Sequence, residues 1–204
     1  MVTVVNYGMG NLGSVKNMLK KVGAEFVVSS SRIDIENATK LILPGVGSFD
    51  QGIINLKELG YFDIIKEKVI NDKIPILGIC LGMQLLTKES DEGCEKGFGF
   101  VNARARKFNF DNDSKLKVPH MGWNFINIKK DNRIYNGLKE EQRFYFVHSF
   151  FVDCFDKQDI LTTTTFGHEF VSSFQKENIF GAQFHPEKSH KFGINFFKNF
   201  VEKC

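Results

Sequence analysis

The sequence has little of what marks secreted, metal-binding or disordered chains. Its 4 prolines in 204 residues are too few for a disordered or linker-rich protein. Its 4 cysteines (Cys80, Cys94, Cys154 and Cys204) include no C-x-x-C pair, which argues against a disulfide framework or a zinc site and favours a reducing cytoplasm. The net charge of +3 is too small to indicate a nucleic-acid-binding surface.

Long hydrophobic runs are also missing. The longest uncharged segment, Met1–Val15, is interrupted by glycines and asparagines and falls short of the roughly 18 apolar residues of a membrane-spanning helix. It lacks the basic start of a secretory signal, since the first charged side chain is Lys16. With 42% hydrophobic residues the chain can bury a sizeable core, and no repeat or linker divides it. We therefore expect a single domain over residues 1–204.

Apolar runs and amphipathic stretches alternate through the first half of the chain. Helical spacing of apolar residues from Leu12 to Val22 predicts a helix that Gly23 is placed to end. Strands are expected at Val2–Val5, Phe26–Val28, Lys40–Leu43 and Ile74–Ile79, and further helices at Ile53–Leu59, Phe62–Ile70 and Met83–Leu86. This alternation is typical of a parallel sheet with helices on both faces.

The second half contains mostly strand signals with short connections. We expect strands at Gly99–Phe110, Trp123–Ile128, Phe144–Phe151, Ile160–Phe166, Phe170–Phe174 and Ile179–Phe184. A closing helix is predicted from Phe192, Phe196 and Phe200, which recur every four residues and are expected to be core residues. The predicted fold is therefore α/β, with three layers, a mostly parallel sheet flanked by helices, and an added antiparallel portion.

The strongest local motif is Gly78-Ile79-Cys80-Leu81-Gly82, between a predicted strand and a predicted helix. It is the thiol counterpart of the G-x-S-x-G nucleophile elbow, a sharp turn that requires small residues on both sides of the nucleophile. Such a turn aims the Leu81 N–H and the start of the helix at the reacting centre, where they favour negative charge. A small buried cysteine is the simpler interpretation of Cys80, but the two glycines favour a nucleophile.

Two other segments can complete such a site. In an extended backbone, residues two apart point the same way, so His185 and Glu187, with Pro186 between them, can supply a base and its orienting carboxylate. The segment Pro44–Phe49 places Gly45 and Gly47 after a strand, where backbone N–H groups can approach a developing oxyanion. Taken alone, the His185–Glu187 segment would more often be a surface turn, and an ordinary strand-to-helix turn explains the Pro44–Phe49 segment equally well.

A competing pattern lies near the N-terminus. Gly8, Gly10 and Gly13 follow the first strand in the G-x-G-x-x-G spacing of a dinucleotide-binding loop. The second strand ends in Ser29–Arg32 without the acidic residue of an NAD site, which leaves an NADP-binding reductase as an alternative. That alternative leaves the cysteine and histidine motifs unexplained. His120 and His148 are not at metal-ligand spacing from any partner, so no metal site is expected.

Together these residues resemble the class I glutamine amidotransferases, in which G-x-C-x-G is followed by His-x-Glu near the C-terminus. Within that family the chain is most similar to the glutaminase subunits of imidazole glycerol phosphate synthases. The matching segments cover essentially the whole chain and are Asn6–Leu12, Pro44–Phe49, Gly78–Leu86, Val118–Asn124, Tyr145–Ser149 and Phe184–Ser189. The segments Phe98–Phe110 and Phe150-Phe151 match the usual pattern only loosely.

The resemblance implies a mechanism and a set of roles. Cys80 would attack the side-chain amide of glutamine, His185 would pass a proton to the leaving ammonia, and Glu187 would orient His185. The oxyanion would be held by N–H groups of Leu81, Val46 and Gly47. Glutamine-binding positions would be Gly45, Gly47, Gln84, Ser149 and Phe150, and positions facing the partner would be Asn11, Met121, Trp123 and Lys188. No cofactor is implied.

The resemblance also implies a partner and a pathway. Ammonia would pass through a (β/α)8 barrel cyclase to a ribonucleotide precursor, giving imidazole glycerol phosphate for histidine synthesis. The glutaminase would be nearly silent without that partner, and we hypothesise that an oxyanion loop with its N–H turned away is the cause, because Gly45 and Gly47 can flip easily. A paralogue that supplies ammonia for amino-sugar or surface-polysaccharide synthesis stays open as an alternative. The intact Cys80, His185 and Glu187 argue against a scaffold that has lost activity.

Overall fold

The computed structural model describes residues 1–110, 116–137 and 141–204. Five parallel strands form the first part of its main sheet, in the order β2-β1-β3-β4-β13. Their bounds are β1 Val2–Val5, β2 Phe26–Ser29, β3 Lys40–Gly45, β4 Ile76–Cys80 and β13 Ile179–Ala182. Because the strands are parallel, the ends of β3 and β4 reach the same edge of the sheet, and Gly45 is paired with Cys80 there.

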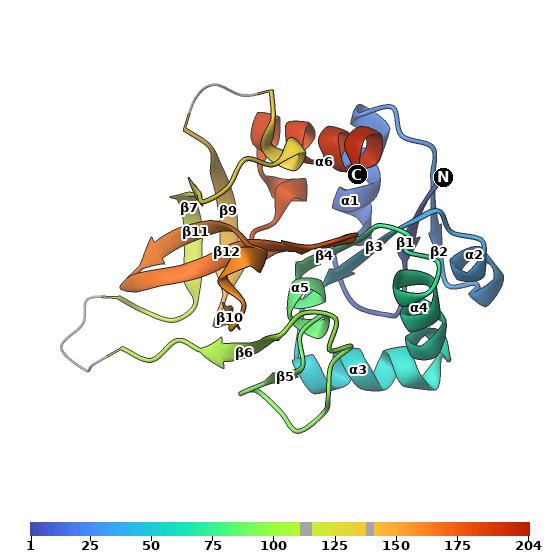
Figure 1. The fold of residues 1–204 in the computed structure, drawn as a ribbon, viewed down its shortest axis with the longest axis horizontal. Helices are drawn as coiled ribbons and strands as arrows, with labels where there is room; N and C mark the ends of the chain where they lie inside the picture. The colour runs from blue at the N-terminus through green and yellow to red at the C-terminus, as the bar shows by residue number, and fades with distance from the viewer. Residues whose placement is uncertain (111–115, 138–140) are drawn as a thin grey trace.

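Helices cover both faces of this parallel part, as Figure 1 shows. The helices α1 and α6 lie on one side and α3, α4 and α5 on the other. Side chains alternate between the two cores along a strand: Leu41 and Leu43 of β3 face one core, and Ile42 faces the other. The helices are α1 Leu12–Lys21, α2 Arg32–Glu36, α3 Phe49–Glu58, α4 Tyr61–Ile70, α5 Leu81–Leu85 and α6 His190–Lys203.

The main sheet continues beyond β13 with mostly antiparallel strands. The order is β13-β12-β10-β6-β5, with β11 and β8 attached beside β12. These strands are β5 Glu89–Ser90, β6 Ala103–Lys107, β8 Asn127–Ile128, β10 Phe150–Cys154, β11 Ile160–Phe166 and β12 His168–Lys176. A separate antiparallel pair is formed by β7 His120–Phe125 and β9 Arg143–His148. The predicted α/β architecture with an antiparallel portion is confirmed.

Several predicted boundaries are wrong. The expected strand Phe144–Phe151 is two strands, because the chain leaves β9 after His148 and joins the main sheet as β10 from Phe150. The expected strand Trp123–Ile128 also divides, into parts of β7 and β8. The expected helix Met83–Leu86 begins directly after Cys80 instead. Short 3-10 turns over Arg133–Tyr135, Lys157–Asp159 and Pro186–Lys188 were not predicted.

None of the helices in the described part of the chain combines the length and the hydropathy of a membrane span. The predicted core role of the α6 phenylalanines is confirmed, because Phe192, Phe196 and Phe200 are all at most 5% exposed. Phe192 and Phe196 pack in one aromatic cluster with Phe144 and Phe184, and Phe200 packs against Phe180 of β13, so these side chains join α6 to the strands.

Candidate active site

Cys80 lies on a strained turn between β4 and α5. Its φ of 54° and ψ of −108° are unusual for a residue with a side chain. The flanking glycines make the turn possible: a Cβ atom on Gly78 would lie 2.6 Å from the backbone of Gly82, and a Cβ on Gly82 would overlap the carbonyl oxygen of Leu43. The predicted sharp strand-to-helix turn is therefore confirmed, and it requires glycine at both positions.

His185 and Glu187 form the closest ionisable pair of this region. His185 Nδ1 lies 2.7 Å from Glu187 Oε1, and each side chain is only 2% exposed. The local reasoning that predicted this pairing was wrong, because Pro186–Lys188 forms a 3-10 turn and not an extended segment. The turn nevertheless brings Glu187 back beside the imidazole, with its other carboxylate oxygen, Oε2, buried without a hydrogen-bond partner in the described structure.

The charge state of His185 follows from its neighbours. Burial lowers the pKa of His185, but hydrogen bonding and charge interactions with Cys80 and Glu187 outweigh burial and raise it to about 10. Nε2 of His185, the nitrogen not used by Glu187, is buried and has no well-aligned partner in the described structure. It is therefore available to exchange a proton with a group that enters the site.

Backbone contacts with β9 fix the position of His185. The His185 N–H donates to the carbonyl of Tyr145 at 2.8 Å. The Ser189 hydroxyl donates to the carbonyl of His185 at 2.6 Å and accepts from the Tyr145 N–H at 3.0 Å. The backbone of His185 is thus attached to β9 on one side and to the turn before α6 on the other.

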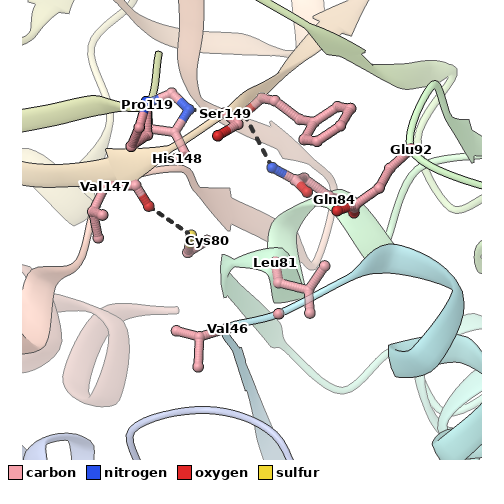
Figure 2. A pocket seen from close by; sticks show the side chains of 11 residues that line it. Val46, Cys80, Leu81, Gln84, Glu92, Pro119, Val147, His148 and Ser149 are labelled. Carbon is pink, nitrogen blue, oxygen red and sulfur yellow. Dashed lines mark hydrogen bonds between the residues drawn. The ribbon is translucent and has the colours of Figure 1, made fainter. Parts of the chain in front are cut away.

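A cavity of about 370 Å³ opens beside Cys80 (Figure 2). This volume is in the range of small-molecule sites. Seven predicted site residues line it, namely Val46, Gly47, Cys80, Leu81, Gln84, Ser149 and Phe150. Gly45, His185 and Glu187 do not line it: Gly45 ends β3 beside Cys80, and the other two lie buried behind the cavity wall.

The predicted oxyanion loop follows β3. Gly45 is in close contact with the start of α5, because a Cβ there would lie 2.9 Å from Leu81 Cβ and 2.6 Å from the Tyr7 hydroxyl. Val46 is 46% exposed, and Gly47 has a φ of 120°, which favours glycine. The loop therefore combines a tightly packed start with an exposed tip at the cavity.

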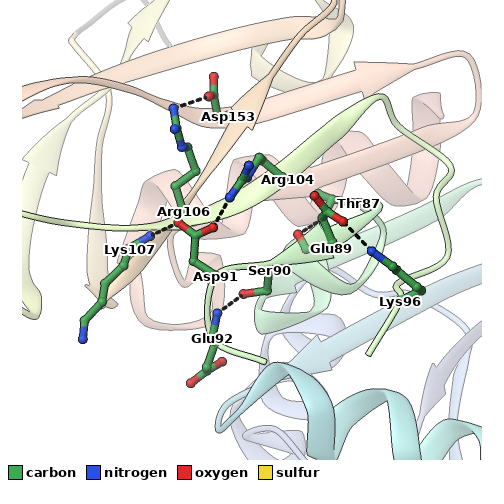
Figure 3. Close-up of polar contacts among 10 residues, drawn as sticks. All are labelled: Thr87, Glu89, Ser90, Asp91, Glu92, Lys96, Arg104, Arg106, Lys107 and Asp153. Atoms are coloured by element: carbon green, nitrogen blue, oxygen red, sulfur yellow. Dashed lines mark hydrogen bonds and ion pairs between the residues drawn. The ribbon is translucent and has the colours of Figure 1, made fainter. Parts of the chain in front are cut away.

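Glu92 lines the cavity and was missed by the sequence analysis. Its Oε2 accepts a hydrogen bond of 2.7 Å from the Phe49 N–H at the start of α3. The neighbouring Asp91 pairs with Arg104 and accepts from the Lys107 N–H, and the Glu92 N–H donates to Ser90 Oγ at 3.1 Å, as Figure 3 shows. The loop that carries Asp91 and Glu92 is thereby attached to β6. The sequence held no signal for Glu92, since it follows no strand or helix that the patterns predict.

Polar side chains behind the cavity connect it to the Cys80 sulfur. Gln84 Nε2 donates to the Phe150 carbonyl at 3.1 Å and to Gln183 Oε1 at 3.2 Å. Gln183 Nε2 in turn lies 3.7 Å from Cys80 Sγ, and the sulfur lies 3.9 Å from the Val147 carbonyl oxygen. The side chain of Gln183 is fully buried. The amide N–H of Gln183 therefore faces the sulfur and favours negative charge on it.

The four predicted docking residues are all exposed. Met121 and Trp123 are 63% and 42% exposed on the outer face of β7, where Phe125 is also exposed. Asn11 caps α1 by accepting from the Ser14 N–H at 3.2 Å. Lys188 has its Nζ 5.7 Å from the centre of the Tyr145 ring. Three neighbouring apolar side chains on one strand face form an exposed apolar patch.

The glycine turn at Gly8–Gly13 contacts the chain itself. A Cβ on Gly10 would lie 3.1 Å from the Pro44 side chain and 3.3 Å from the Gly45 nitrogen. The close approach that this glycine permits is therefore to the start of the oxyanion loop. This arrangement gives no support to the NADP-binding alternative, in which the approaching group is a pyrophosphate.

His120 and His148, which the sequence analysis left without a role, form a buried pair. His120 Nδ1 lies 3.0 Å from His148 Nε2, and His148 lines the cavity. The sequence predicted a strand over His148 but none over His120, because the expected strand began at Trp123, and it gave no sign that β7 pairs with β9. Among the described residues, no group of three or more His, Cys, Asp or Glu side chains is placed to hold a metal ion.

A family model described as glutamine amidotransferase class-I matches residues 3–204, and the chain belongs to this family. It is 53% identical over 204 residues to "Imidazole glycerol phosphate synthase subunit HisH 2" of Methanococcus maripaludis, covering 100% of both chains. It is 48% identical over 202 residues to the protein of the same name from Pseudomonas aeruginosa, covering 99% of both. A subunit HisH 1 of Campylobacter jejuni is 46% identical over 203 residues, with 98% of this chain and 99% of that one covered.

Solved structures of low identity share the fold. A crystal structure described as a glutamine amidotransferase superposes with a TM-score of 0.74 at 19% identity, covering 99% of this chain and 98% of that one. The structure of PurLQS from Thermotoga maritima gives a TM-score of 0.72 at 19% identity, with 98% and 96% covered. These likenesses show the class I glutamine amidotransferase fold.

Proposed function

We propose that residues 1–204 form one glutaminase domain that hydrolyses glutamine and supplies ammonia to a (β/α)8 barrel cyclase, as the glutaminase subunit of imidazole glycerol phosphate synthase. The observation that supports it most is the buried pair of His185 and Glu187 beside Cys80, at a cavity lined by Gln84, Ser149 and Phe150. The relatives named as HisH subunits supply the pathway.

The proposed chemistry has two halves. The Cys80 thiolate attacks the amide carbon of the glutamine side chain, and the imidazolium of His185 donates its Nε2 proton to the leaving ammonia. A γ-glutamyl thioester remains on the sulfur. Water then attacks the thioester carbon, His185 accepts the proton, and glutamate leaves as the thiolate is restored. Glu187 holds the ring and stabilises its positive charge in both halves.

Substrate binding is assigned to the cavity wall. The N–H groups of Leu81 and of the Val46–Gly47 loop hold the oxyanion, in line with the roles that the family resemblance implies. Gln84, Ser149 and Phe150 contact the glutamine, with Gly45 shaping the start of the loop. Glu92 is the carboxylate at this cavity among the described lining residues, and we assign it to the α-ammonium group of the substrate.

The docking surface is assigned to the exposed face of β7, with Asn11 and Lys188 at its margins. Truncation of a large exposed side chain at the centre of such a patch weakens association strongly. The loop that carries Asn11 also contacts the oxyanion loop through Gly10. Partner binding at this surface can therefore change the conformation of the oxyanion loop. This supports the hypothesis that the glutaminase is nearly silent alone and that the loop turns its N–H inward when the partner binds.

We place this reaction in the cytoplasm, where biosynthetic enzymes work and cysteines stay reduced. All four cysteines are free thiols in the structure. The reaction as written needs no cofactor, because acid–base and thiol chemistry account for each step.

Replacing Cys80 with Ala tests the proposed function. The reconstituted pair with the barrel cyclase should lose glutamine hydrolysis and keep synthesis of imidazole glycerol phosphate from free ammonia, because only the nucleophile is removed. Ammonia release is measured with and without the cyclase's substrate. Retained glutaminase activity in the Ala variant would contradict the role of Cys80, and failure of both activities in the wild-type pair would contradict the pathway.

A second pathway is tested separately. Three of the most similar relatives have a number after the subunit name, HisH 2 or HisH 1, and this favours testing the paralogous function in amino-sugar synthesis. Complementation of a histidine auxotroph lacking its own glutaminase subunit distinguishes the two. Growth without histidine supports the histidine pathway, and glutaminase activity without complementation supports the paralogue.

A further inference from the structure

The buried pair of His120 and His148 is not used by the proposed chemistry. The two residues face each other across β7 and β9, where they are paired in register. They are 4% and 6% exposed. His120 stacks between Phe146 and Phe166, with ring centres 4.8 Å and 4.3 Å away. Two polar rings in such apolar surroundings require hydrogen bonds, and the structure supplies all of them.

The hydrogen bonds have only one possible direction. The Asn124 amide oxygen accepts from the Phe125 N–H at 2.8 Å, which identifies the other amide atom as nitrogen, a donor with two hydrogens. Those hydrogens go to the Thr165 carbonyl at 2.9 Å and to His120 Nε2 at 3.2 Å. His120 Nε2 is therefore an acceptor, so its Nδ1 must bear the hydrogen.

The same logic continues through the second ring. His120 Nδ1–H donates to His148 Nε2 at 3.0 Å, so His148 Nε2 has no hydrogen. The His148 Nδ1–H then donates to the carbonyl oxygen of Phe150 at 2.7 Å. Burial lowers the pKa of His120 to about 4 and that of His148 to about 3, which keeps both rings neutral at physiological pH. A neutral ring has one donor and one acceptor, so the direction of the hydrogen bonds cannot be reversed at one ring alone.

The hydrogen-bond chain ends at the Phe150 carbonyl, which lies at the glutamine cavity. The Phe150 carbonyl that receives the His148 hydrogen also accepts from Gln84 Nε2 at 3.1 Å. Gln84 and Phe150 both line the cavity, and Gln84 also donates to Gln183, whose amide faces Cys80 Sγ. Displacement of the Phe150 carbonyl therefore displaces the cavity wall.

The hydrogen-bond chain starts at Asn124 and His120 on β7, the strand assigned to docking. Alternate residues of β7 point in opposite directions, so His120 is buried while Met121 and Trp123 are exposed on the outer face. A shift of β7 thus moves His120 and the docking patch together.

We propose that His120 and His148 are positioning residues: a one-directional hydrogen-bond chain from Asn124 through both rings holds the Phe150 carbonyl, and through it Gln84, in the geometry that binds glutamine. The chain couples β7, which meets the partner, to the substrate wall. This inference rests on the proposed glutaminase function, but its hydrogen-bond pattern can be measured without any activity.

The first test is the position of the ring hydrogens. Nitrogen-15 NMR of the histidine side chains in the wild-type chain should show both His120 and His148 neutral with hydrogen on Nδ1 between pH 6 and pH 8. Assignment uses the single variants His120→Gln and His148→Gln. A hydrogen on Nε2 of either ring, or a charged ring, overturns the proposal whatever the glutaminase assay shows.

The second test separates binding from chemistry in the reconstituted pair. His120→Phe keeps the stacking and removes the hydrogen bonds, and should raise the KM for glutamine about three- to tenfold while kcat changes less than twofold. His120→Gln, whose amide can accept from Asn124 and donate to His148, should restore most of the KM. The matched control is His168→Phe, an exposed histidine of the same aromatic cluster, which should leave both constants unchanged.

Folding is checked by thermal unfolding of each variant. If His120→Phe does not fold, Asn124→Ala, at the partly exposed start of the chain, replaces it and should raise the KM about two- to fivefold. An unchanged KM in a folded variant overturns the proposal. A wild-type pair that does not hydrolyse glutamine contradicts the proposed function instead, while the NMR result still decides whether the chain exists.

Discussion

The pair of His185 and Glu187 allows a quantitative prediction for Glu187→Gln. Raising the pKa of His185 from 6.5 to about 10 corresponds to about 5 kcal/mol in favour of the imidazolium, at about 1.4 kcal/mol for each pKa unit. Interactions with Cys80 and with Glu187 both contribute to this rise in pKa, which is the net result after they have offset the lowering by burial. A hydrogen bond to a charged group contributes about 1.5–3 kcal/mol. The Gln variant should therefore lower the pKa of His185 by about 1–2 units and kcat by about 10- to 150-fold.

The assay is glutamate release by the reconstituted pair across pH, with the pKa of His185 followed by NMR in the isolated chain. Glu177→Gln is the matched control, because Glu177 is an exposed carboxylate whose side chain is 65% exposed and pairs with Lys73. It should leave kcat and the pKa of His185 unchanged. A fall in kcat of less than threefold in Glu187→Gln, together with an unmoved pKa, would refute the reasoning.

Stability supplies an independent readout of the same variant. The pKa of His185 is raised in the folded chain, so the stability that its charge contributes is fully present below about pH 6.5 and is lost as pH rises to about 10. The difference in free energy of unfolding between wild type and Glu187→Gln should therefore stay constant up to about pH 8, near the lowered pKa of the variant, and shrink between about pH 8 and pH 10. Urea denaturation at several pH values measures it, and a difference that grows toward pH 10 would contradict the sign.

Two further predictions concern the turn and the docking patch. Gly82→Ala should destabilise the chain by more than about 3 kcal/mol, because the new Cβ would overlap the Leu43 carbonyl. The control Gly13→Ala in α1 should change stability by less than about 1 kcal/mol. Urea denaturation measures both variants, and equal effects would contradict the steric account. Trp123→Ala should weaken cyclase binding about 30-fold or more and leave unfolding unchanged. The control Phe155→Ala replaces a side chain that is also exposed but lies away from β7, and it should leave binding unchanged. Calorimetric titration measures both affinities, and equal values would place the interface elsewhere.

The parallel half of the fold was predictable because its signals are local. The short run Val2–Val5 has valine at three of its four positions and is buried on both faces, and the sequence pattern gives its bounds correctly. Gly23 ends α1 in a left-handed conformation, as its position indicated. The predicted turn at Cys80 was accessible for the same reason, since the glycines that it requires lie within two residues.

The antiparallel half depends on contacts between distant residues, which periodicity does not describe. Nothing in the run Phe144–Phe151 shows that the chain changes sheets at Ser149. The contact of His120 with His148 arises from strand pairing across 28 residues. Glu92 reaches the cavity only because Asp91 and its neighbours attach that loop to β6. Each of these features is set by tertiary structure, and therefore no local pattern identified it.

The backbone conformation at Cys80 lowers the stability of the fold while it positions the sulfur for the proposed chemistry. A φ of 54° disfavours any side chain by about 1–3 kcal/mol. A glycine there would relax the main chain, but it would remove the sulfur. The conformation that is unfavourable for the main chain is thus the one that places the buried sulfur beside the cavity, so the proposed activity and thermal stability trade off at a single position.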